Sequence, residues 1–252
     1  MTALLQGRAL SKRFGAVVAT ADLDIEVRAG EVHAVIGPNG AGKSTLLGLL
    51  SGEVRPDSGR ILLDGRDVTR MPVHRRARLG LGRTFQVSNV LPSFTVLENV
   101  AIAIQARVRS GLRLLEPADA DPELNEPARL ILERFSLLEL ADRRAAELAH
   151  GERRLLELAL TLATKPRFLL LDEPFAGVAA GDSERLVRIL DALRHDLGLL
   201  LVEHDMQAVF RLADRVTVLV QGRCIASGTP AEVRADSAVR AAYLGDSRGD
   251  AG

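Results

Sequence analysis

The sequence has very little cysteine, no excess charge of either sign and no long apolar run. Its single cysteine, Cys224, excludes an intramolecular disulfide and favours a reducing compartment. The 33 basic and 33 acidic residues balance and form no basic stripe, so we expect no nucleic-acid partner. No apolar stretch approaches the roughly 18 residues of a membrane helix, and the first residues lack a signal-peptide pattern. We therefore expect a soluble cytosolic protein.

Apolar residues make up 47% of the 252 residues, enough for a large core. The N-terminal part predicts short strands joined by turns, with Asp64-Gly65 as a hairpin turn. After this part the spacing of apolar residues becomes helical. The proline- and acid-rich segment 116–127 is predicted to be a loop between helices.

The C-terminal part alternates between apolar strands and helices over residues 167–214. This order is typical of a parallel α/β sheet. A hairpin is predicted over 215–228, followed by a last helix with Thr229 as its N-cap. The predicted domains are an α/β core formed by 1–86 and 156–245, an inserted helical subdomain at 87–155, and a disordered tail at 246–252.

The pattern G-x-x-x-x-G-K-[ST] lies between a predicted strand and a predicted helix. Its glycines let backbone N–H groups surround phosphate oxygens, and the helix dipole adds positive potential. We expect Lys43 to reach the β- and γ-phosphates and the Ser44 hydroxyl to bind Mg²⁺. The residues predicted to hold a nucleoside triphosphate here are Gly37, Asn39, Gly40, Gly42, Lys43, Ser44 and Thr45.

Two further apolar strands end in residues suited to nucleotide hydrolysis. The stretch RFLLLDEP ends in Asp172 and Glu173. At a strand tip, Asp172 can hold the Mg²⁺ shell and Glu173 can polarise the water that attacks the γ-phosphate. The stretch LLLVEHDM places His204 at the same end of another strand, where it can hydrogen-bond the γ-phosphate. The guanine-selecting pattern N-K-x-D is absent, which disfavours a GTPase.

In this order, the motifs resemble those of the ATP-binding subunit of ATP-binding-cassette (ABC) transporters, from Phe14 to Leu244. The resemblance implies an α/β P-loop NTPase with a RecA-like parallel sheet core, an N-terminal antiparallel β-subdomain and an inserted helical subdomain. It also implies that Phe14 stacks on adenine and that Gln86 meets Mg²⁺ and the attacking water. In this family each ATP lies between one subunit's glycine loop and the other subunit's signature segment. The implied cofactors are ATP and Mg²⁺.

The segment LAHGERR, residues 148–154, stands in the place of the family signature. The resemblance implies that four of its residues meet the nucleotide held by the other subunit: Ala149, His150, Gly151 and Glu152. The predicted helix that starts near Gly151 would then direct its N-terminal dipole at the γ-phosphate. Four positions depart from the usual residues of the family: Ala149 (serine), His150 (glycine), Glu152 (glutamine) and Ala179 (aspartate). We hypothesise that His150 takes over a polar contact to the nucleotide or the partner.

The stretches LAHGERR, LDEPFAG, VEHDM and AAYLG resemble subunits of branched-chain or hydrophobic amino-acid importers. Importers of urea and short amides share much of this pattern. The resemblance implies transmembrane permease subunits and a second ATP-binding subunit as partners, with a solute-binding protein as an indirect one. The second ATP-binding subunit is either another copy of this chain or a sister subunit. It places the chain at the cytoplasmic face of the membrane. Segment 87–103 would then contribute to the permease groove, although we expect most of its apolar residues in the core. The basic run Arg75–Arg78 is predicted to be a solvated helix face, with contact to anionic lipid as the alternative.

Two functions of other classes stay open. A soluble ABC ATPase of repair or translation would share the nucleotide motifs, but such proteins often carry two cassettes or long coiled-coil inserts. A non-catalytic, nucleotide-gated interaction module is a second alternative, prompted by Ala149 and Ala179. Co-purification with permease subunits would exclude the first alternative, and a steady-state ATPase assay would decide the second.

Overall fold

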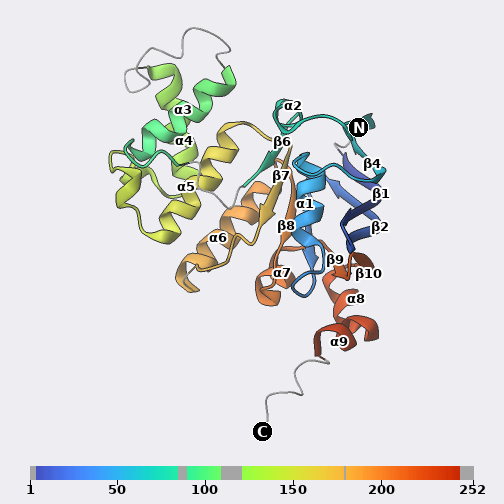
Figure 1. The fold of residues 1–252 in the computed structure, drawn as a ribbon. Helices are drawn as coiled ribbons and strands as arrows, with labels where there is room; N and C mark the ends of the chain where they lie inside the picture. Colours follow the sequence, from blue (N-terminus) through green and yellow to red (C-terminus); the bar gives the residue numbers. More distant parts are fainter. Residues whose placement is uncertain (1–3, 85–89, 109–120, 179, 245–252) are drawn as a thin grey trace. The chain divides into compact units, whose positions relative to one another are not determined.

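The computed structural model describes residues 4–84, 90–108, 121–178 and 180–244 (Figure 1). The predicted site residue Gln86 and the substituted position Ala179 lie outside these ranges. The chain divides into two compact units. The first comprises Met1–Leu81, Arg167–Phe175 and Leu190–Gly252, and the second comprises Gly82–Pro166 and Ala176–Ile189. The glycine-rich loop therefore belongs to the first unit and the signature segment to the second.

An antiparallel sheet opens the first unit, with its strands in the order β2-β1-β4-β5. The strands are β1 (Leu4–Phe14), β2 (Val17–Arg28), β4 (Ser58–Leu63) and β5 (Arg66–Asp67). Asp64 and Gly65 join β4 to β5 with φ values of 50° and 78°. Two consecutive residues with positive φ make the hairpin turn that this dipeptide favours, so the predicted turn is confirmed.

A second, mostly parallel sheet has the order β10-β9-β3-β8-β7-β6. Its strands are β3 (Val32–Ile36), β6 (Leu81–Arg83), β7 (Phe168–Asp172), β8 (Gly198–Val202), β9 (Arg215–Val220) and β10 (Arg223–Gly228). Strands β3, β7 and β8 are buried along their whole length, and β8 pairs in parallel with both others. The predicted parallel α/β sheet is confirmed. Because parallel strands end at one edge, the residues after β3, β7 and β8 meet there.

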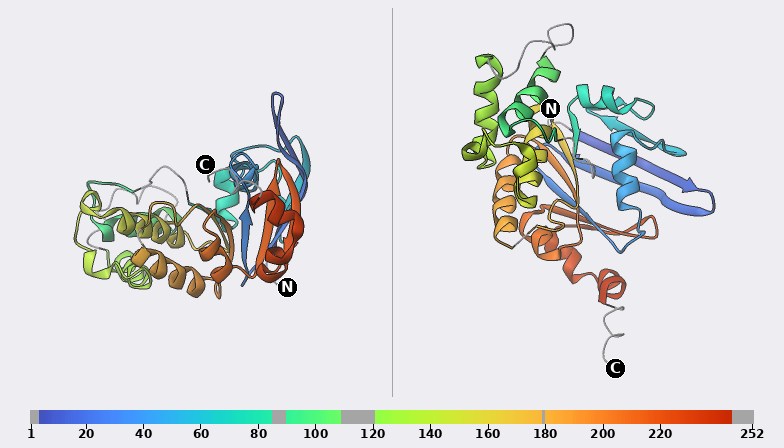
Figure 2. Two further views of the ribbon diagram at one scale, coloured as in Figure 1. Left: turned by 90° about the horizontal axis from the view of Figure 1, so that it is seen from below. Right: turned by 60° about the vertical axis from the view of Figure 1, so that its left-hand side comes forward.

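Helix α1 (Lys43–Ser51) lies in the core of the first unit. Leu46, Leu47, Leu49 and Leu50 have no exposed surface, so the helix is buried on all sides from Leu46 onward. These leucines pack in one cluster with apolar residues of both sheets, and Figure 2 shows α1 alongside the antiparallel strands. Burial of one leucine side chain stabilises a fold by roughly 1.5–3 kcal/mol. The packing therefore fixes the helix that begins at the predicted phosphate-binding lysine.

Helix α2 (Val73–Arg78) contains the basic run that was expected to be a solvated face. That prediction is wrong for Arg76, which is 1% exposed. Its guanidinium donates hydrogen bonds to four backbone carbonyl oxygens, those of Leu49 (2.8 Å), Leu50 (2.6 Å), Thr69 (2.9 Å) and Met71 (2.9 Å). The two leucine carbonyls belong to the last turn of α1, where regular helix partners run out. Arg76 therefore caps α1, and burial lowers its pKa to about 10.

The second unit contains α3 (Val96–Val108), α4 (Pro122–Arg134) and α5 (His150–Ala163), with 3₁₀ turns at Leu138–Leu140 and Ala145–Glu147. Helix α6 (Ala180–Leu193) begins in the second unit and ends in the first. The loop predicted over 116–127 is wrong from Pro122 onward, because α4 begins there. Asp121 caps α4 by accepting the Glu123 N–H at 2.9 Å. Pro122 occupies the first helical position, where a missing N–H has no consequence.

The apolar residues of segment 87–103 that the structure describes lie mostly in the core, as predicted. Val96, Val100 and Ala101 have no exposed surface. Leu91 and Phe94 differ, since they are 39% and 41% exposed. These two large apolar side chains of the described segment therefore face solvent in this chain.

The C-terminal helices are α7 (Met206–Leu212), α8 (Pro230–Ala235) and α9 (Ser237–Leu244). The predicted cap of α8 is confirmed, because Thr229 Oγ1 accepts the Glu232 N–H at 3.3 Å and Glu232 Oε2 accepts the Thr229 N–H at 2.7 Å. The prediction that α8 is the last helix is wrong. Asp236 starts α9 by accepting the Ala238 N–H at 2.7 Å, which satisfies the first turn of a new helix.

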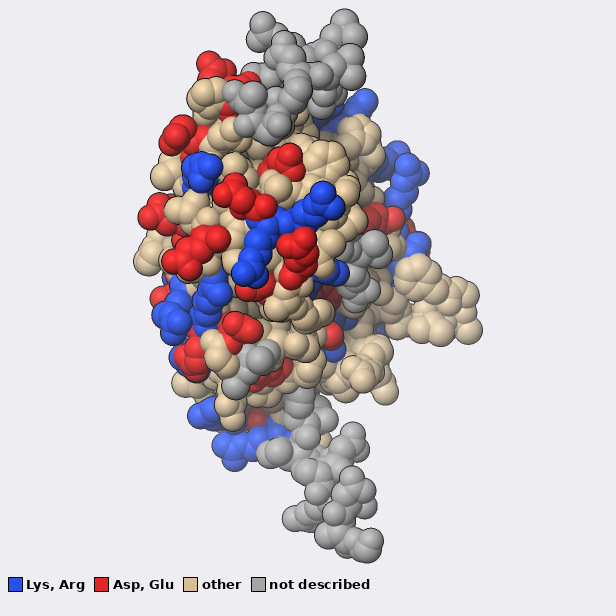
Figure 3. Space-filling view, turned by 90° about the vertical axis from the view of Figure 1, so that its left-hand side faces the viewer, with Lys and Arg blue, Asp and Glu red and all other residues tan. Residues whose placement is uncertain are grey.

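The surface carries charges of both signs. On the face drawn in Figure 3, acidic and basic side chains are interspersed. Among the described residues, no helix combines the length and the apolar character needed to cross a membrane.

Candidate nucleotide-binding site

The loop between β3 and α1 needs glycine at two positions. A Cβ atom on Gly37 would lie 2.2 Å from the Leu219 carbonyl oxygen. Gly42 has a φ of 102°, and a Cβ atom there would lie 2.1 Å from the Ala19 carbonyl oxygen. The loop backbone is therefore held close to neighbouring strands at the N-terminus of α1, where N–H groups and the helix dipole suit a phosphate. Of the other predicted phosphate-binding residues, Asn39, Gly40 and Ser44 are exposed and Thr45 is half-buried.

Lys43 is the first residue of α1 and is 7% exposed. Its Nζ donates hydrogen bonds to the carbonyl oxygens of Gly37 at 2.6 Å and Pro38 at 3.1 Å. Burial lowers the pKa of Lys43, and three carboxylates at the ends of β7 and β8 oppose that shift: Glu173, Asp172 and Glu203. The ammonium group therefore lies against the glycine loop and within electrostatic reach of both strand ends.

Asp172 and Glu173 face different surroundings although they are adjacent. Asp172 is the last residue of β7 and is 4% exposed. Glu173 has a φ of 46°, in the left-handed region that residues other than glycine seldom adopt, and its side chain is 39% exposed. Such backbone strain costs on the order of 1–3 kcal/mol and is found where a functional site fixes it. The turn therefore directs the Glu173 carboxylate outward while β7 buries Asp172.

His204 follows β8, the neighbour of β7. Its Nδ1 lies 3.8 Å from Glu173 Oε1 and 3.8 Å from Glu203 Oε2, and its side chain is 63% exposed. These distances exceed a hydrogen bond, so the groups are neighbours without a direct bond. The structure therefore brings together Lys43, Asp172, Glu173 and His204 at one edge of the sheet.

Glu203 is a buried residue of this site that the sequence reasoning missed. It has no exposed surface, and its carboxylate accepts three backbone N–H bonds, from Phe175 (2.8 Å), His204 (2.9 Å) and Asp205 (3.3 Å). Burial raises the pKa of Glu203, and these hydrogen bonds oppose the shift. The signal in the sequence is an acidic residue at the end of an apolar run, the same signal that marks Asp172.

Phe14 ends β1 at the tip of the β1–β2 hairpin. It is 51% exposed, and Val17 and Val18 of the facing strand are 66% and 39% exposed. Lys12 Nζ lies 5.4 Å from the centre of the phenylalanine ring. An exposed ring beside apolar side chains suits stacking on a flat heterocycle. The contact of Phe14 with adenine stays a prediction.

The signature segment starts α5 in the second unit. The Ala149 N–H donates to Glu152 Oε2 at 2.8 Å, so Glu152 caps the helix. Alanine at position 149 has no hydroxyl with which to complete the cap. A Cβ atom on Gly151 would lie 2.8 Å from Asp182 Oδ2, the end of a side chain that can move aside. The nucleotide contacts of this segment stay predictions, for Ala149, His150, Gly151 and Glu152 alike; His150 is exposed.

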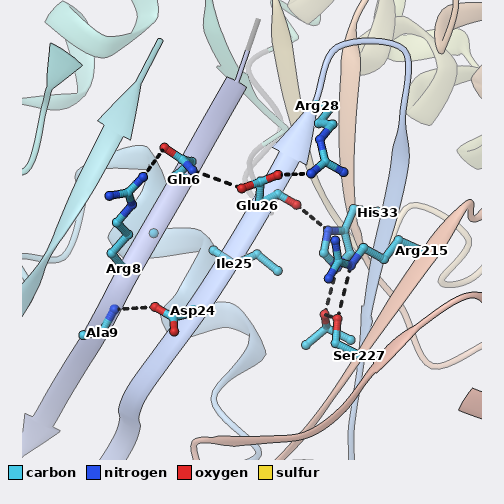
Figure 4. A pocket seen from close by; sticks show the side chains of 12 residues that line it. Gln6, Arg8, Ala9, Asp24, Ile25, Glu26, Arg28, His33, Arg215 and Ser227 are labelled. Carbon is cyan, nitrogen blue, oxygen red and sulfur yellow. Dashed lines mark hydrogen bonds and ion pairs between the residues drawn. The ribbon is translucent and has the colours of Figure 1, made fainter. Parts of the chain in front are cut away.

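A polar pocket of about 590 Å³ lies elsewhere in the first unit, between β1–β2 and β9–β10 (Figure 4). At this pocket His33 is 1% exposed, with Nδ1 2.7 Å from the Glu26 carbonyl oxygen and Nε2 2.8 Å from Thr217 Oγ1. Because a carbonyl only accepts, Nδ1 carries the proton and Thr217 donates to Nε2. Burial is the main cause that lowers the pKa of His33 to about 4. This neutral histidine near the start of β3 joins the two sheets.

The geometry at the edge of the parallel sheet defines a P-loop nucleoside triphosphatase. The glycine loop and Lys43 fit phosphate groups. The Ser44 hydroxyl and the Asp172 carboxylate fit Mg²⁺, which prefers hard oxygen ligands and few of them from the protein.

Comparison with known proteins agrees with this class. A family model described as "ABC transporter" matches residues 20–176, and one described as "Branched-chain amino acid ATP-binding cassette transporter" matches residues 223–248. The high-affinity branched-chain amino acid transport ATP-binding protein LivG of Salmonella typhimurium is 40% identical over 250 residues, which are 96% of this chain and 98% of that protein. The lipopolysaccharide export system ATP-binding protein LptB of Acidithiobacillus ferridurans is 38% identical, with 98% of each chain covered.

A solved structure gives the same result at the level of the fold. The crystal structure of the ADP conformation of an ATP-binding cassette of an ABC transporter matches with a TM-score of 0.86 and 33% identity, covering 98% of this chain and 100% of that one. The chain therefore belongs to the ABC transporter family and is an ATP-binding-cassette ATPase. The predicted fold class is confirmed.

Proposed function

We propose that this chain is the ATP-hydrolysing subunit of an importer for branched-chain or related hydrophobic amino acids. The observation that carries the ATPase role is the meeting of the glycine loop, Lys43, Glu173 and His204 at one sheet edge. The cargo is supported by the 40% identity to LivG and by the branched-chain amino acid family model over residues 223–248.

In the proposed reaction ATP is the substrate. The N–H groups of the glycine loop and the Lys43 ammonium bind its phosphates, and Phe14 stacks on adenine. Ser44 and Asp172 would hold Mg²⁺, which neutralises phosphate charge when bound. Glu173 orients the attacking water and accepts its proton, and His204 donates a hydrogen bond to the γ-phosphate. Gln86, outside the described residues, stays a predicted contact to Mg²⁺ and water.

The proposed assembly contains two ATP-binding subunits. The signature segment of one subunit, with His150 and the Gly151 backbone, meets the nucleotide on the glycine loop of the other. Closure of this dimer moves transmembrane permease subunits at the cytoplasmic face of the membrane, and a solute-binding protein delivers the cargo to them. The exposed Leu91 and Phe94 support a permease contact on the second unit.

An uptake experiment tests this function. In cells that lack the chain, the wild type should restore uptake of labelled leucine. We expect Lys43→Asn to lower that uptake by about tenfold or more, because the phosphate-binding ammonium is lost. Lys165→Asn is the matched control, since Lys165 is exposed and its φ of 53° is one that asparagine tolerates.

The same cells distinguish the alternatives. Wild-type uptake of urea or acetamide, without uptake of leucine, would assign the chain to a short-amide importer. If cells that lack the chain lose lipopolysaccharide export but keep leucine uptake, the chain would be assigned to an exporter like LptB. A purified wild-type chain without steady-state ATPase activity would leave only the nucleotide-gated module.

A further inference from the structure

We infer that Glu203 is a positioning residue for ATP hydrolysis, whose buried carboxylate holds the turn that carries Glu173 against the loop that carries His204. The inference rests on the catalytic roles proposed for Glu173 and His204. Glu203 itself has no exposed surface, so it acts through these neighbours and not on the substrate.

One carboxylate oxygen fixes the turn after β7. The Glu173 N–H donates to the Val202 carbonyl of β8 at 2.9 Å. Pro174 has no N–H, and the next donor, the Phe175 N–H, reaches Glu203 Oε1 at 2.8 Å. The first residue of the turn, Glu173, therefore bonds β8, and the last, Phe175, bonds Glu203, the residue that follows β8. The hydrogen bond from Phe175 to Glu203 helps to hold Glu173 at its φ of 46°, a conformation that needs support from its surroundings.

The other carboxylate oxygen fixes the loop after β8. Glu203 Oε2 accepts the His204 N–H at 2.9 Å and the Asp205 N–H at 3.3 Å. Asp205 in turn caps α7 by accepting the Gln207 N–H at 2.9 Å. The backbone of His204 is therefore held between Glu203 and the start of a helix. The result is that His204 Nδ1 lies 3.8 Å from Glu173 Oε1.

The chemistry requires a carboxylate at this position. Both oxygens of Glu203 accept N–H bonds, and they accept them from two different loops. Glutamine has almost the same shape but only one oxygen, so its NH₂ group would face the N–H donors of one loop. Because the site is buried, water cannot satisfy the donors that lose their partner. Glu203→Gln should therefore shift Glu173 against His204 with little change in volume.

Steady-state ATPase kinetics of the purified full chain test the inference. We expect Glu203→Gln to lower kcat by about tenfold or more and to change KM and the Kd for ATP by less than about twofold. Glu26→Gln is the matched control and should keep the wild-type kcat, because Glu26 bonds Gln6 and Arg28 away from the site. A parallel loss of ATP affinity would show instead that Glu203 acts on nucleotide binding and would overturn the inference.

A double-mutant cycle with His204→Ala separates positioning from general damage. If Glu203 acts by placing His204 against Glu173, Glu203→Gln should lower kcat much less in the His204→Ala background than in the wild type. Fully independent effects, or a lowered Tm with kcat unchanged, would overturn the inference. Should Glu203→Gln not fold, Glu203→Asp retains the charge but shortens the reach to Phe175, and a wild-type kcat in that variant would be equally decisive. The proposed function fails separately if Glu173→Gln hydrolyses ATP normally.

Discussion

At the scale of single residues, five titratable groups are buried in the described part of the chain: Asp172, and four groups whose compensating partners are described above. Lys43 bonds carbonyls of the glycine loop beside three carboxylates. Arg76 has backbone carbonyls as partners, and Glu203 has backbone N–H groups. His33 stays neutral and uses both ring nitrogens. Asp172 and two of these four groups, Lys43 and Glu203, belong to the nucleotide site, whereas His33 and Arg76 do not, so burial alone does not identify a functional residue.

His33 should make stability depend on pH. Its pKa is lowered from 6.5 to about 4 in the fold, so the unfolded chain binds more protons between these values. The free energy of unfolding should therefore fall by about 3 kcal/mol as the pH drops from about 6.5 to about 4. Urea unfolding of the wild type and of His33→Gln at several pH values in this range gives the free energy of unfolding as a function of pH. The difference between the two slopes is the contribution of His33.

The matched control for His33 is His74→Gln, because His74 is exposed. This variant should show the same pH dependence as the wild type. Equal slopes for the wild type and His33→Gln would mean that the buried imidazole carries a proton in the fold, against the hydrogen-bond directions described above.

At the scale of elements, the site depends on how α1 is held. Four buried leucines fix its sides, and Arg76 of α2 caps its C-terminal carbonyls. The position of its N-terminus, with Lys43, is therefore set by contacts along the sides and at the C-terminal end of the helix. Support for the phosphate site therefore extends to α2, whose Arg76 bonds the opposite end of α1.

Arg76→Met tests this cap. The change leaves the carbonyls of Leu49 and Leu50 without their guanidinium partner in a buried place, which should cost about 2–4 kcal/mol of unfolding free energy. The midpoint of urea unfolding measures this loss. Arg75→Met, in the same helix but exposed, should stay within about 0.5 kcal/mol of the wild type. Equal stability of the two variants would show that the Arg76 hydrogen bonds contribute nothing.

The sequence was sufficient to predict the parts of the fold and site that local pattern determines. Gly42 and Lys43 follow from motif spacing, and Asp172 follows from the end of an apolar run. Arg76 was missed because its partners Leu49 and Leu50 are distant in the chain and are carbonyls of apolar residues. The start of α4 at Pro122 does not follow from the local pattern, because prolines and acids indicate loops in many sequences, although both also suit the first turn of a helix.

At the scale of the whole molecule, the glycine loop and the signature segment belong to different compact units of one chain. Two copies arranged head to tail would give two equivalent ATP sites, each with a loop from one copy and a signature from the other. The substitution by Ala149 removes a hydroxyl from this interface, and Glu152 is engaged in capping α5. The proposed closure therefore relies on His150, the Gly151 backbone and the α5 N-terminus.

The most direct test of the account is the association state of Glu173→Gln with ATP, measured by analytical ultracentrifugation. Without the carboxylate that accepts the proton of water, hydrolysis should stop while ATP stays bound, because Lys43 and the glycine loop are unchanged. We predict a dimer in ATP and Mg²⁺, a monomer in ADP, and loss of the ATP dimer when Lys43→Asn is added. A variant that binds ATP yet stays monomeric at every concentration would contradict the shared site.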